Sequence, residues 1–218
     1  LRIMAHLSGD KNLTHAFNNN IDVHSATASE IFNVSLEDVT SDHRRNAKAI
    51  NFGLIYGMSA FGLTRQLGIA RDEAQAYLDT YFKRYTGVKD YMDSTKELAK
   101  KNLFVETILG RKLHVAAIND SNGLRRQAAE RAAINAPLQG SAADIIKKAM
   151  IDVDQWIGGE NSDIKMIMQV HDELIFEVKK EFADDAINEI INLMESSVEL
   201  KIPLIVDANQ GTNWNEAH

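Results

Sequence analysis

Residues 165–178 read Lys165-Met-Ile-Met-Gln-Val170, His171-Asp172-Glu173 and Leu174-Ile-Phe-Glu-Val178, and here the hydrophobic pattern of the 218-residue chain changes. The two apolar runs are too short for stable helices, and they flank a polar tripeptide. Two strands joined at a polar tip are therefore expected. Strands gather late in the chain and helical patterns gather in the middle. This order predicts an α+β fold with a mostly helical insertion in a body that carries a small sheet.

Outward from this hairpin, the remaining elements follow from periodicity, caps and breakers. Gly9 should end a helix over residues 1–8, and Thr40 or Ser41 should cap a long helix that ends at Gly57. Pro137 should interrupt the helical pattern around it, because proline lacks the N–H that a helix needs. The other expected helices cover residues 22–32, 71–84, 88–101, 124–135, 141–156 and 182–200. A hairpin is expected over 104–115 and a further strand over 204–208.

The charge of the chain is unevenly distributed. The 24 Lys and Arg residues against 31 Asp and Glu give a formal net charge of −7, which does not indicate a nucleic-acid binder. However, residues 42–148 contain 18 basic and 11 acidic side chains, whereas residues 149–218 contain 4 and 15. This asymmetry predicts a polyanionic partner for the middle of the chain. The absence of cysteine excludes a disulfide framework, and no apolar run of about 18 residues predicts a membrane span.

Four residues at four-residue spacing mark the helix expected after Thr40. Arg44, Lys48, Phe52 and Tyr56 would share one broad face. A guanidinium and an ammonium one turn apart can bind successive phosphates, and the rings beyond them offer flat surfaces for a base or sugar. The alternative is an ordinary amphipathic helix with a solvated basic end and a buried aromatic end. Gly53 suits close approach of another group, because glycine inside a helix otherwise destabilises it.

The polar tip His171-Asp172-Glu173 is a candidate metal site. A carboxylate on a rigid two-strand turn suits Mg²⁺, which takes one or two protein carboxylates together with substrate phosphates. The alternative is an ordinary polar turn. Residues 166–170 and 174–176 are apolar enough to be largely buried, which would hold the tip stiffly.

Further donors lie in the later helical region and near the start of the chain. A row of long donor side chains on a helix suits hydrogen bonding to a phosphate backbone or to a base edge in a groove. The alternative is a solvated helix face beside Glu130. The row consists of Arg125, Arg126, Arg131, Asn135 and Gln139. His24 stands in Asp22-Val-His24-Ser, and alone it reads more readily as a structural histidine.

Together these motifs resemble those of the family A DNA polymerases. Residues 44–57, Arg44-Arg-Asn-Ala-Lys48-Ala-Ile-Asn-Phe52-Gly-Leu-Ile-Tyr56-Gly, are similar to motif B of that family. Met168-Gln-Val-His-Asp172-Glu-Leu resembles motif C, and residues 1–9 resemble the segment directly after motif A. The other matches are Asp22-Val-His24, Arg131-Ala-Ala-Ile-Asn135-Ala-Pro-Leu-Gln139-Gly and Trp214-Asn-Glu-Ala-His218. The similarity covers essentially the whole chain, in the family's order, and is closest to bacterial members.

The resemblance implies a right-hand fold and a role for each motif residue in template-directed DNA synthesis. Residues 26–131 would be fingers, and residues 1–25 and 132–218 would be palm, with the thumb absent. Arg44 and Lys48 would bind the triphosphate of the dNTP, and Lys48 could act as acid toward pyrophosphate. His24 would add a phosphate contact, Phe52 would stack near the sugar and base, and Tyr56 would shape the pocket of the nascent base pair.

The resemblance also implies contacts to primer–template DNA and to two Mg²⁺ ions. Asp172 would be one of two metal-binding aspartates, with Glu173 beside it as a further catalytic carboxylate. The other aspartate belongs to motif A and would precede Leu1, so we expect a fragment that is inactive alone. The expected primer–template contacts are Tyr56, Arg125, Arg126, Arg131, Asn135, Gln139 and His171.

The biological setting implied is replication and repair by a monomer in the bacterial cytoplasm, associated with the nucleoid and not with a membrane. Three alternatives stay open. A single-subunit RNA polymerase has a similar helix, although Phe52-Gly53 favours DNA synthesis. A nuclease that uses Asp172 and Glu173 would need further carboxylates near the tip. A nucleotide- or DNA-binding module without catalysis is the alternative from a different class.

Overall fold

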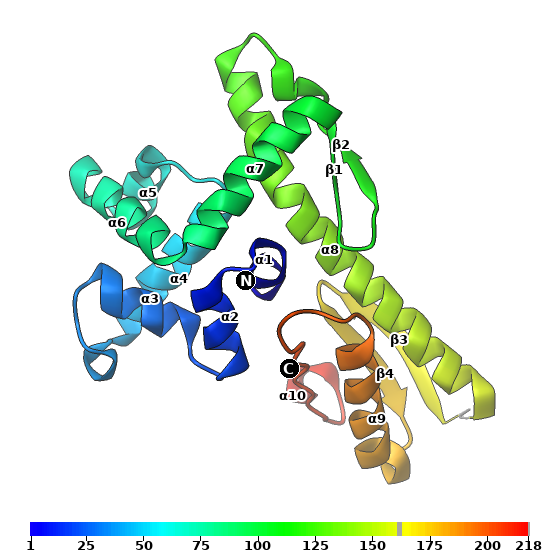
Figure 1. Ribbon diagram of the computed structural model, residues 1–218. Coiled ribbons are helices and arrows are strands. Elements are labelled where there is room, and N and C mark those ends of the chain that lie inside the picture. The colour runs from blue at the N-terminus through cyan, green and yellow to red at the C-terminus, as the bar shows by residue number, and fades with distance from the viewer. Residues whose placement is uncertain (161–162, 218) are drawn as a thin grey trace. The chain divides into compact units, whose positions relative to one another are not determined.

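The computed structural model describes residues 1–160 and 163–217, and its helices and strands belong to two compact units. The first unit is Leu1–Ser141 and the second is Ala142–His218. Among the described residues the strands form two separate two-stranded antiparallel sheets, and helices make up most of the rest (Figure 1). This composition confirms the predicted α+β class. No described helix is both long enough and apolar enough to cross a bilayer.

The first unit begins with three short helices whose ends are set by local signals. They are α1 (Arg2–Ser8), α2 (Lys11–Asn18) and α3 (Val23–Ile31). Gly9 ends α1 as expected, in the left-handed conformation with φ 60°. Asp10, only 3% exposed, caps α2 by accepting hydrogen bonds from the amides of Asn12 and Leu13. Its other carboxylate oxygen accepts a hydrogen bond from the Gly87 amide at 2.9 Å. This bond joins α2 to the first turn of the helix over Thr86–Asn102.

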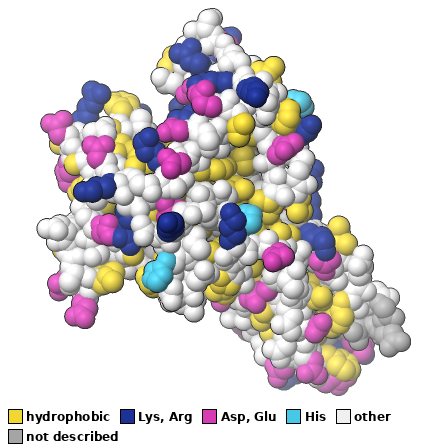
Figure 2. All heavy atoms as spheres, viewed as in Figure 1, with side chains coloured by type: hydrophobic (Ala, Val, Ile, Leu, Met, Phe, Trp, Pro, Cys, Tyr) yellow, Lys and Arg dark blue, Asp and Glu magenta, His cyan; other side chains and the backbone are white. Residues whose placement is uncertain are grey.

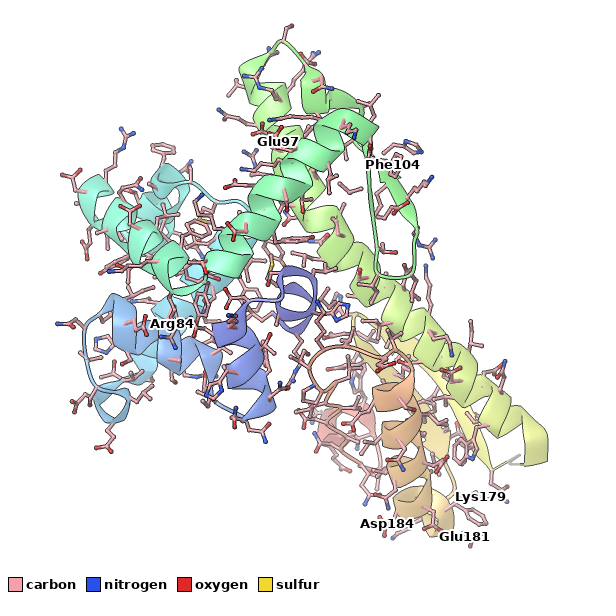
Figure 3. The ribbon with its side chains drawn as sticks, viewed as in Figure 1. Arg84, Glu97, Phe104, Lys179, Glu181 and Asp184 are labelled. Atoms are coloured by element: carbon pink, nitrogen blue, oxygen red, sulfur yellow. The ribbon has the colours of Figure 1, made fainter. Side chains whose placement is uncertain are left out.

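Four further helices follow in the first unit. They are α4 (Ser41–Ile55), α5 (Ala60–Leu67), α6 (Arg71–Arg84) and α7 (Thr86–Asn102), with a short 3₁₀ helix η1 (Leu36–Asp38) before them. Thr40 caps α4 as predicted, in a capping box with His43. Helix α3 packs against α4 and α6. Arg84 on α6 forms an ion pair with Glu30 on α3, and its carbonyl accepts a bond from Asn12 of α2 (Figure 3).

A small hairpin and the start of the longest helix close the first unit. Strands β1 (Phe104–Glu106) and β2 (Lys112–His114) pair antiparallel, with Val105 opposite Leu113, and the 3₁₀ helix η2 (Ala116–Asn119) follows. The hairpin lies against α8 (Gly123–Glu160), where a Cβ at Gly140 would come within 2.7 Å of Thr107 (Figure 1). The Ile108 amide also donates a bond to the Ser141 hydroxyl at 2.9 Å.

Helix α8 corrects the expected break at Pro137. The helix runs without interruption through Pro137, so residues 124–135 and 141–156 are parts of one element. Proline costs one backbone hydrogen bond here, but its fixed φ is compatible with a helix. Pro137 is itself buried, as are Ala133, Ile134 and Leu138 beside it. Packing on both sides of the proline therefore maintains the helix that local propensity would end.

The second unit contains the predicted polar-tipped hairpin. Strands β3 (Ile164–Val170) and β4 (Glu173–Val178) pair antiparallel, followed by η3 (Lys180–Phe182) and α9 (Ala183–Ser196). The core joins α8, α9 and one face of the hairpin through Ala149, Val153, Ile164, Ala186, Ile190 and Met194. The short helix α10 (Trp214–Ala217) covers most of the expected C-terminal motif, and His218 lies outside the described residues.

Two expectations for the second unit are wrong. Residues 204–208 form no strand: the Val206 amide donates to the Glu195 carboxylate at 2.8 Å and not to a neighbouring strand. The runs beside the tip are also less buried than expected, since Ile167 is 56% and Met168 43% exposed. The pairing register shifts by one residue between Met166 and Met168, and only one face of this two-stranded sheet packs on the core.

Candidate functional site

The four spaced residues of α4 lie on one accessible side of the helix. Arg44, Lys48 and Tyr56 are exposed and Phe52 is half-buried, whereas Ala47, Ile50 and Leu54 form the buried side. The Phe52 and Tyr56 rings are 6.4 Å apart between centroids, and Tyr56 is 40% exposed. The aromatic end is therefore accessible, unlike the buried aromatic end of an ordinary amphipathic helix. The face presents two cations followed by two rings.

His24 on α3 joins this face. Its ring lies 5.7 Å from the Phe52 ring between centroids, at an interplanar angle of 45°. Its Nδ1 is 3.0 Å from Nδ2 of Asn51, a residue of α4 that has no exposed surface. Burial lowers the pKa of His24, and the nearby Arg44 and Lys48 lower it further, although Asp22 acts in the opposite direction. The imidazole is therefore neutral at pH 7.

Asp22 holds both the start of α3 and the guanidinium of Arg44. One carboxylate oxygen accepts bonds from the amides of His24 and Ser25, and the other accepts Nε–H of Arg44 at 2.6 Å. Burial acts to raise the pKa of Asp22, but the bonds from Arg44 and the Ser25 amide outweigh it and keep the pKa below its ordinary value. Arg44 thus has a set position, and its side chain remains 48% exposed.

Lys48 differs from Arg44, one turn away on the same helix. Within residues 1–160 and 163–217 no carboxylate forms an ion pair with its ammonium group, and the residue is exposed. Arg45, by contrast, faces another direction and pairs with Asp42 at 2.9 Å. The accessible face of α4 therefore offers a positioned guanidinium and a mobile ammonium, which together suit an oligophosphate.

Close approaches at two glycines connect α4 to its neighbours. A Cβ at Gly53 would lie 3.0 Å from the sulfur of Met58, which confirms the expectation that another group approaches here. Gly57 follows the helix with φ +73°, and a Cβ there would lie 3.0 Å from Cγ of Arg131. The structure thus places Arg131 of α8 against Gly57, directly after the end of α4.

The other predicted DNA-contacting residues of α8 do not all lie near the end of α4. Arg125 and Arg126 turn toward the loop before α8, since Arg126 donates to the Asp120 carbonyl at 3.0 Å and Arg125 lies 3.8 Å from the Asp120 carboxylate. Gln139 is exposed further along the helix. Asn135 is half-buried, and its Oδ1 is buried without a hydrogen-bond partner among the described residues. A buried amide oxygen of this kind can accept a bond from an added ligand.

The hairpin tip carries the candidate metal ligands. His171 and Asp172 form the two-residue connection, and Glu173 already pairs with Val170 in the sheet. His171 has φ 53°, a left-handed conformation that histidine tolerates better than most residues, and its carbonyl accepts a bond from Gln169. All three tip residues are exposed. The carboxylates at the tip are hard oxygen donors, which suits Mg²⁺.

The described residues hold no complete metal centre. No group of three or more His, Cys, Asp or Glu side chains that could hold an ion lies within residues 1–160 and 163–217.

The distribution of charged side chains on the surface agrees with the pattern in the sequence. Figure 2 shows Asp and Glu side chains gathered over the region of α9, whereas Lys and Arg side chains are intermixed with Asp and Glu over α7.

Two residues that sequence reasoning missed hold groups of the α4 face in place. The sequence indicates Asp22 only as the neighbour of His24, and Asn51 only as a member of motif B. Asn51 lies between Ile50 and Phe52 on the apolar side of α4, and a polar residue on a buried face usually has a hydrogen-bond partner. That pattern was the available signal, although it could not name His24 as the partner.

Comparison with known proteins places these features in a family. Residues 1–216 match the model of DNA polymerase family A. The chain is 55% identical over its whole length to DNA polymerase I of Pseudomonas aeruginosa and 48% identical to that of Rhizobium leguminosarum, covering 24% and 22% of these relatives. It thus spans about a quarter of the length of the curated relatives that it matches.

A solved structure agrees with the sequence relatives. The POL domain of Pol1 from M. smegmatis, in complex with DNA primer–template and dNTP, superposes with a TM-score of 0.95 at 44% sequence identity. The match covers 99% of this chain and 38% of that one. The motifs, the fold and these relatives agree, and the chain belongs to DNA polymerase family A.

Proposed function

We propose that the complete protein containing this chain synthesises DNA on a template, transferring a deoxynucleotide from a dNTP to a primer 3′-hydroxyl. The observation that carries this proposal is the match of nearly the whole chain to a domain solved with primer–template DNA and dNTP. The accessible cations and rings of α4 are chemically suited to such a nucleotide. The family match to DNA polymerases, together with Phe52-Gly53, favours this function over RNA synthesis.

In this proposal the α4 face binds the incoming nucleotide. Arg44 and Lys48 contact the triphosphate, His24 adds a hydrogen bond to a phosphate oxygen, and Phe52 and Tyr56 meet the sugar and base. Negative charge develops on the leaving phosphates during in-line displacement, and cations already in place stabilise it. Lys48, whose ammonium has no carboxylate partner among the described residues, can also give a proton to the leaving pyrophosphate.

The proposed metal ligands are Asp172 and Glu173. Carboxylate oxygens on a tight hairpin fit Mg²⁺, which binds through one or two carboxylates plus substrate phosphates. In the complete protein we propose two ions, with a further aspartate from motif A. When bound, Mg²⁺ lowers the pKa of the primer hydroxyl and offsets charge on the attacking and leaving oxygens.

The remaining site residues are proposed to hold primer–template DNA. Arg131 lies against Gly57 at the end of α4, and Asn135 follows one turn later on α8. We also keep the division into palm (1–25 and 132–218) and fingers (26–131). The other proposed contacts are Arg125, Arg126, Gln139 and His171.

Primer extension by the complete protein tests the proposed function. A labelled primer on a longer template should be extended by the complementary dNTP in the presence of Mg²⁺, and poorly by ribonucleotides. Three outcomes would contradict the proposal. Cleavage of the DNA without extension would support a nuclease, preference for ribonucleotides an RNA polymerase, and tight binding without turnover a binding module.

The isolated 218-residue chain should not extend a primer, because the resemblance assigns the second metal-binding aspartate to motif A. Extension by this chain alone, abolished by Asp172→Ala, would overturn that expectation. We further propose a monomer that acts in replication and repair in the bacterial cytoplasm, near the nucleoid. Light scattering of the complete protein and imaging of a fluorescent fusion would test these two statements.

A further inference from the structure

Behind the α4 face runs a chain of buried hydrogen bonds that ends at His24. Tyr85, at the junction of α6 and α7, is 1% exposed, and its hydroxyl lies 3.0 Å from Oγ1 of Thr27. Thr27 is also 1% exposed, and its Oγ1 lies 3.2 Å from Nδ2 of Asn51. The same Nδ2 lies 3.0 Å from Nδ1 of His24. The chain therefore connects α3, α4 and the end of α6.

The chemistry of these groups fixes which atom donates at each step. The Thr27 hydroxyl has one hydrogen, and its shortest bond, 2.8 Å, goes to the carbonyl of Val23. Because this hydrogen goes to Val23, Thr27 accepts from both Tyr85 and the Asn51 amide nitrogen, and its longer 3.3 Å contact with the Asn51 Oδ1 carries no hydrogen. The second hydrogen of that nitrogen is directed at Nδ1 of His24, which must then be an acceptor.

If Nδ1 of His24 accepts a hydrogen bond, the position of the single hydrogen on the neutral ring is determined. A neutral imidazole carries one hydrogen, so accepting at Nδ1 places that hydrogen on Nε2. Within the described part of the chain no protein group forms a hydrogen bond with Nε2. The His24 ring thus presents an N–H donor on the side away from Asn51.

The tautomer matters because this histidine is neutral. Burial lowers the pKa of His24, and the nearby Arg44 and Lys48 lower it further, although Asp22 acts in the opposite direction. A neutral ring cannot attract a phosphate by net charge, so it contributes only through its N–H. The opposite tautomer would turn a lone pair toward the phosphate and repel it.

We propose that Asn51 is a positioning residue that holds neutral His24 as the Nε2–H tautomer, so that the ring donates a hydrogen bond to a phosphate oxygen of the incoming nucleotide. This inference rests on the proposed function for the identity of the ligand. The tautomer itself does not depend on it, because the chain of hydrogen bonds is present without a nucleotide.

The direct test is ¹⁵N nuclear magnetic resonance of the complete protein, labelled at histidine and free of substrate, at pH 8. Loss of one signal in a His24→Gln variant assigns the ring. The nitrogen shifts should show Nε2 protonated and Nδ1 bare. A ring protonated at Nδ1 alone would overturn the inference, whether or not the protein proves to be a polymerase.

Asn51→Asp provides the second arm, because a carboxylate can only accept from Nδ1–H. The variant should move the single ring hydrogen to Nδ1, which removes the Nε2–H donor, and raise KM for dNTP roughly tenfold, the loss of one hydrogen bond to a charged group. Asn46→Asp is the matched control: it adds the same charge to α4, and Asn46 makes no hydrogen bond to His24.

The outcomes of the second arm are distinct. Affinity for primer–template DNA should stay unchanged in both variants, and the His24 tautomer should change only in Asn51→Asp. Equal effects of the two variants on KM would show that charge alone acts, and would contradict the positioning role. If Asn51→Asp does not fold, the His24 tautomer measured in the unmodified protein still supports or overturns the inference.

Discussion

The α4 face and the β3–β4 tip carry the two halves of the proposed chemistry, and they are built differently. On the α4 face, Arg44 is held by Asp22 and His24 by the fully buried Asn51. At the tip, His171, Asp172 and Glu173 are all exposed on a two-residue connection. The groups proposed to bind phosphate are thus oriented by neighbouring side chains, whereas the tip carboxylates are exposed, where a cation could reach them.

The two constructions predict different effects of substitutions. Removing the Asp172 carboxylate from the tip should leave the fold intact and remove chemistry, because Asp172 is exposed on a two-residue connection. Changing the support of the α4 face should alter both stability and substrate binding, because the same buried groups serve both.

The largest effect is expected at the tip. Asp172→Ala in the complete protein should reduce the rate of nucleotide incorporation by about 10³-fold or more, the several kcal/mol that a bound metal ion contributes. Primer–template affinity and melting temperature should change little. Asp185→Ala on α9 is the control, since it removes an exposed carboxylate from the same unit. A comparable loss in both variants would contradict a specific role for the tip.

A smaller effect is expected where α4 meets Arg131. Gly57→Ala forces alanine into φ +73° and sets its Cβ 3.0 Å from Arg131 Cγ. Gly68→Ala is a matched control, because Gly68 has φ +70° with nothing within 4 Å. Both variants should lose about 1 kcal/mol from backbone strain. Only Gly57→Ala should lose more and also weaken primer–template binding, measured by melting and by duplex titration. Equal behaviour of the two would show that the Arg131 contact is unimportant.

The smallest effect concerns the Asp22–Arg44 pair and pH. The folded-state pKa of Asp22 lies below its ordinary 3.8, so its contribution to stability is present above about pH 4 and is lost as the pH falls through the folded pKa. Asn retains the helix cap but not the ion pair. Asp22→Asn should therefore cost less than about 1 kcal/mol at pH 7, because both partners are over 40% exposed. The difference in melting temperature between the variant and the unmodified protein should shrink toward pH 3. An undiminished difference would contradict a stabilising ion pair between Asp22 and Arg44.

Local signals in the sequence predicted much of this fold. Helix α6 has the predicted bounds, Arg71–Arg84, and Gly9 and Thr40 act as the expected stop and cap. The hairpin with Asp172 in its connection was also predicted from the length of its apolar runs. These features depend on residues within a few positions of one another, which is the range over which propensity and periodicity act.

Tertiary contacts decided the features that the sequence did not predict. The helix passes Pro137 because neighbouring residues are buried, and Val206 bonds to a glutamate and forms no strand. At the candidate site, the motif residues were named from their resemblance to a family, but their supports were not. Asp22 and Arg44 are 22 positions apart, and His24 and Asn51 are 27 apart, so no local pattern connects them.

The central claim is that the accessible face of α4 binds the triphosphate. Single-turnover incorporation by the complete protein, measured against dNTP concentration, tests it most directly when Lys48→Ala is compared with Arg45→Ala. Arg45 lies on the same helix but pairs with Asp42. Lys48→Ala should lower the ratio of maximal rate to dNTP dissociation constant about 10²-fold, with primer–template affinity unchanged and Arg45→Ala nearly silent. Equal loss of incorporation and duplex binding in Lys48→Ala, or equal effects of the two variants, would contradict the claim.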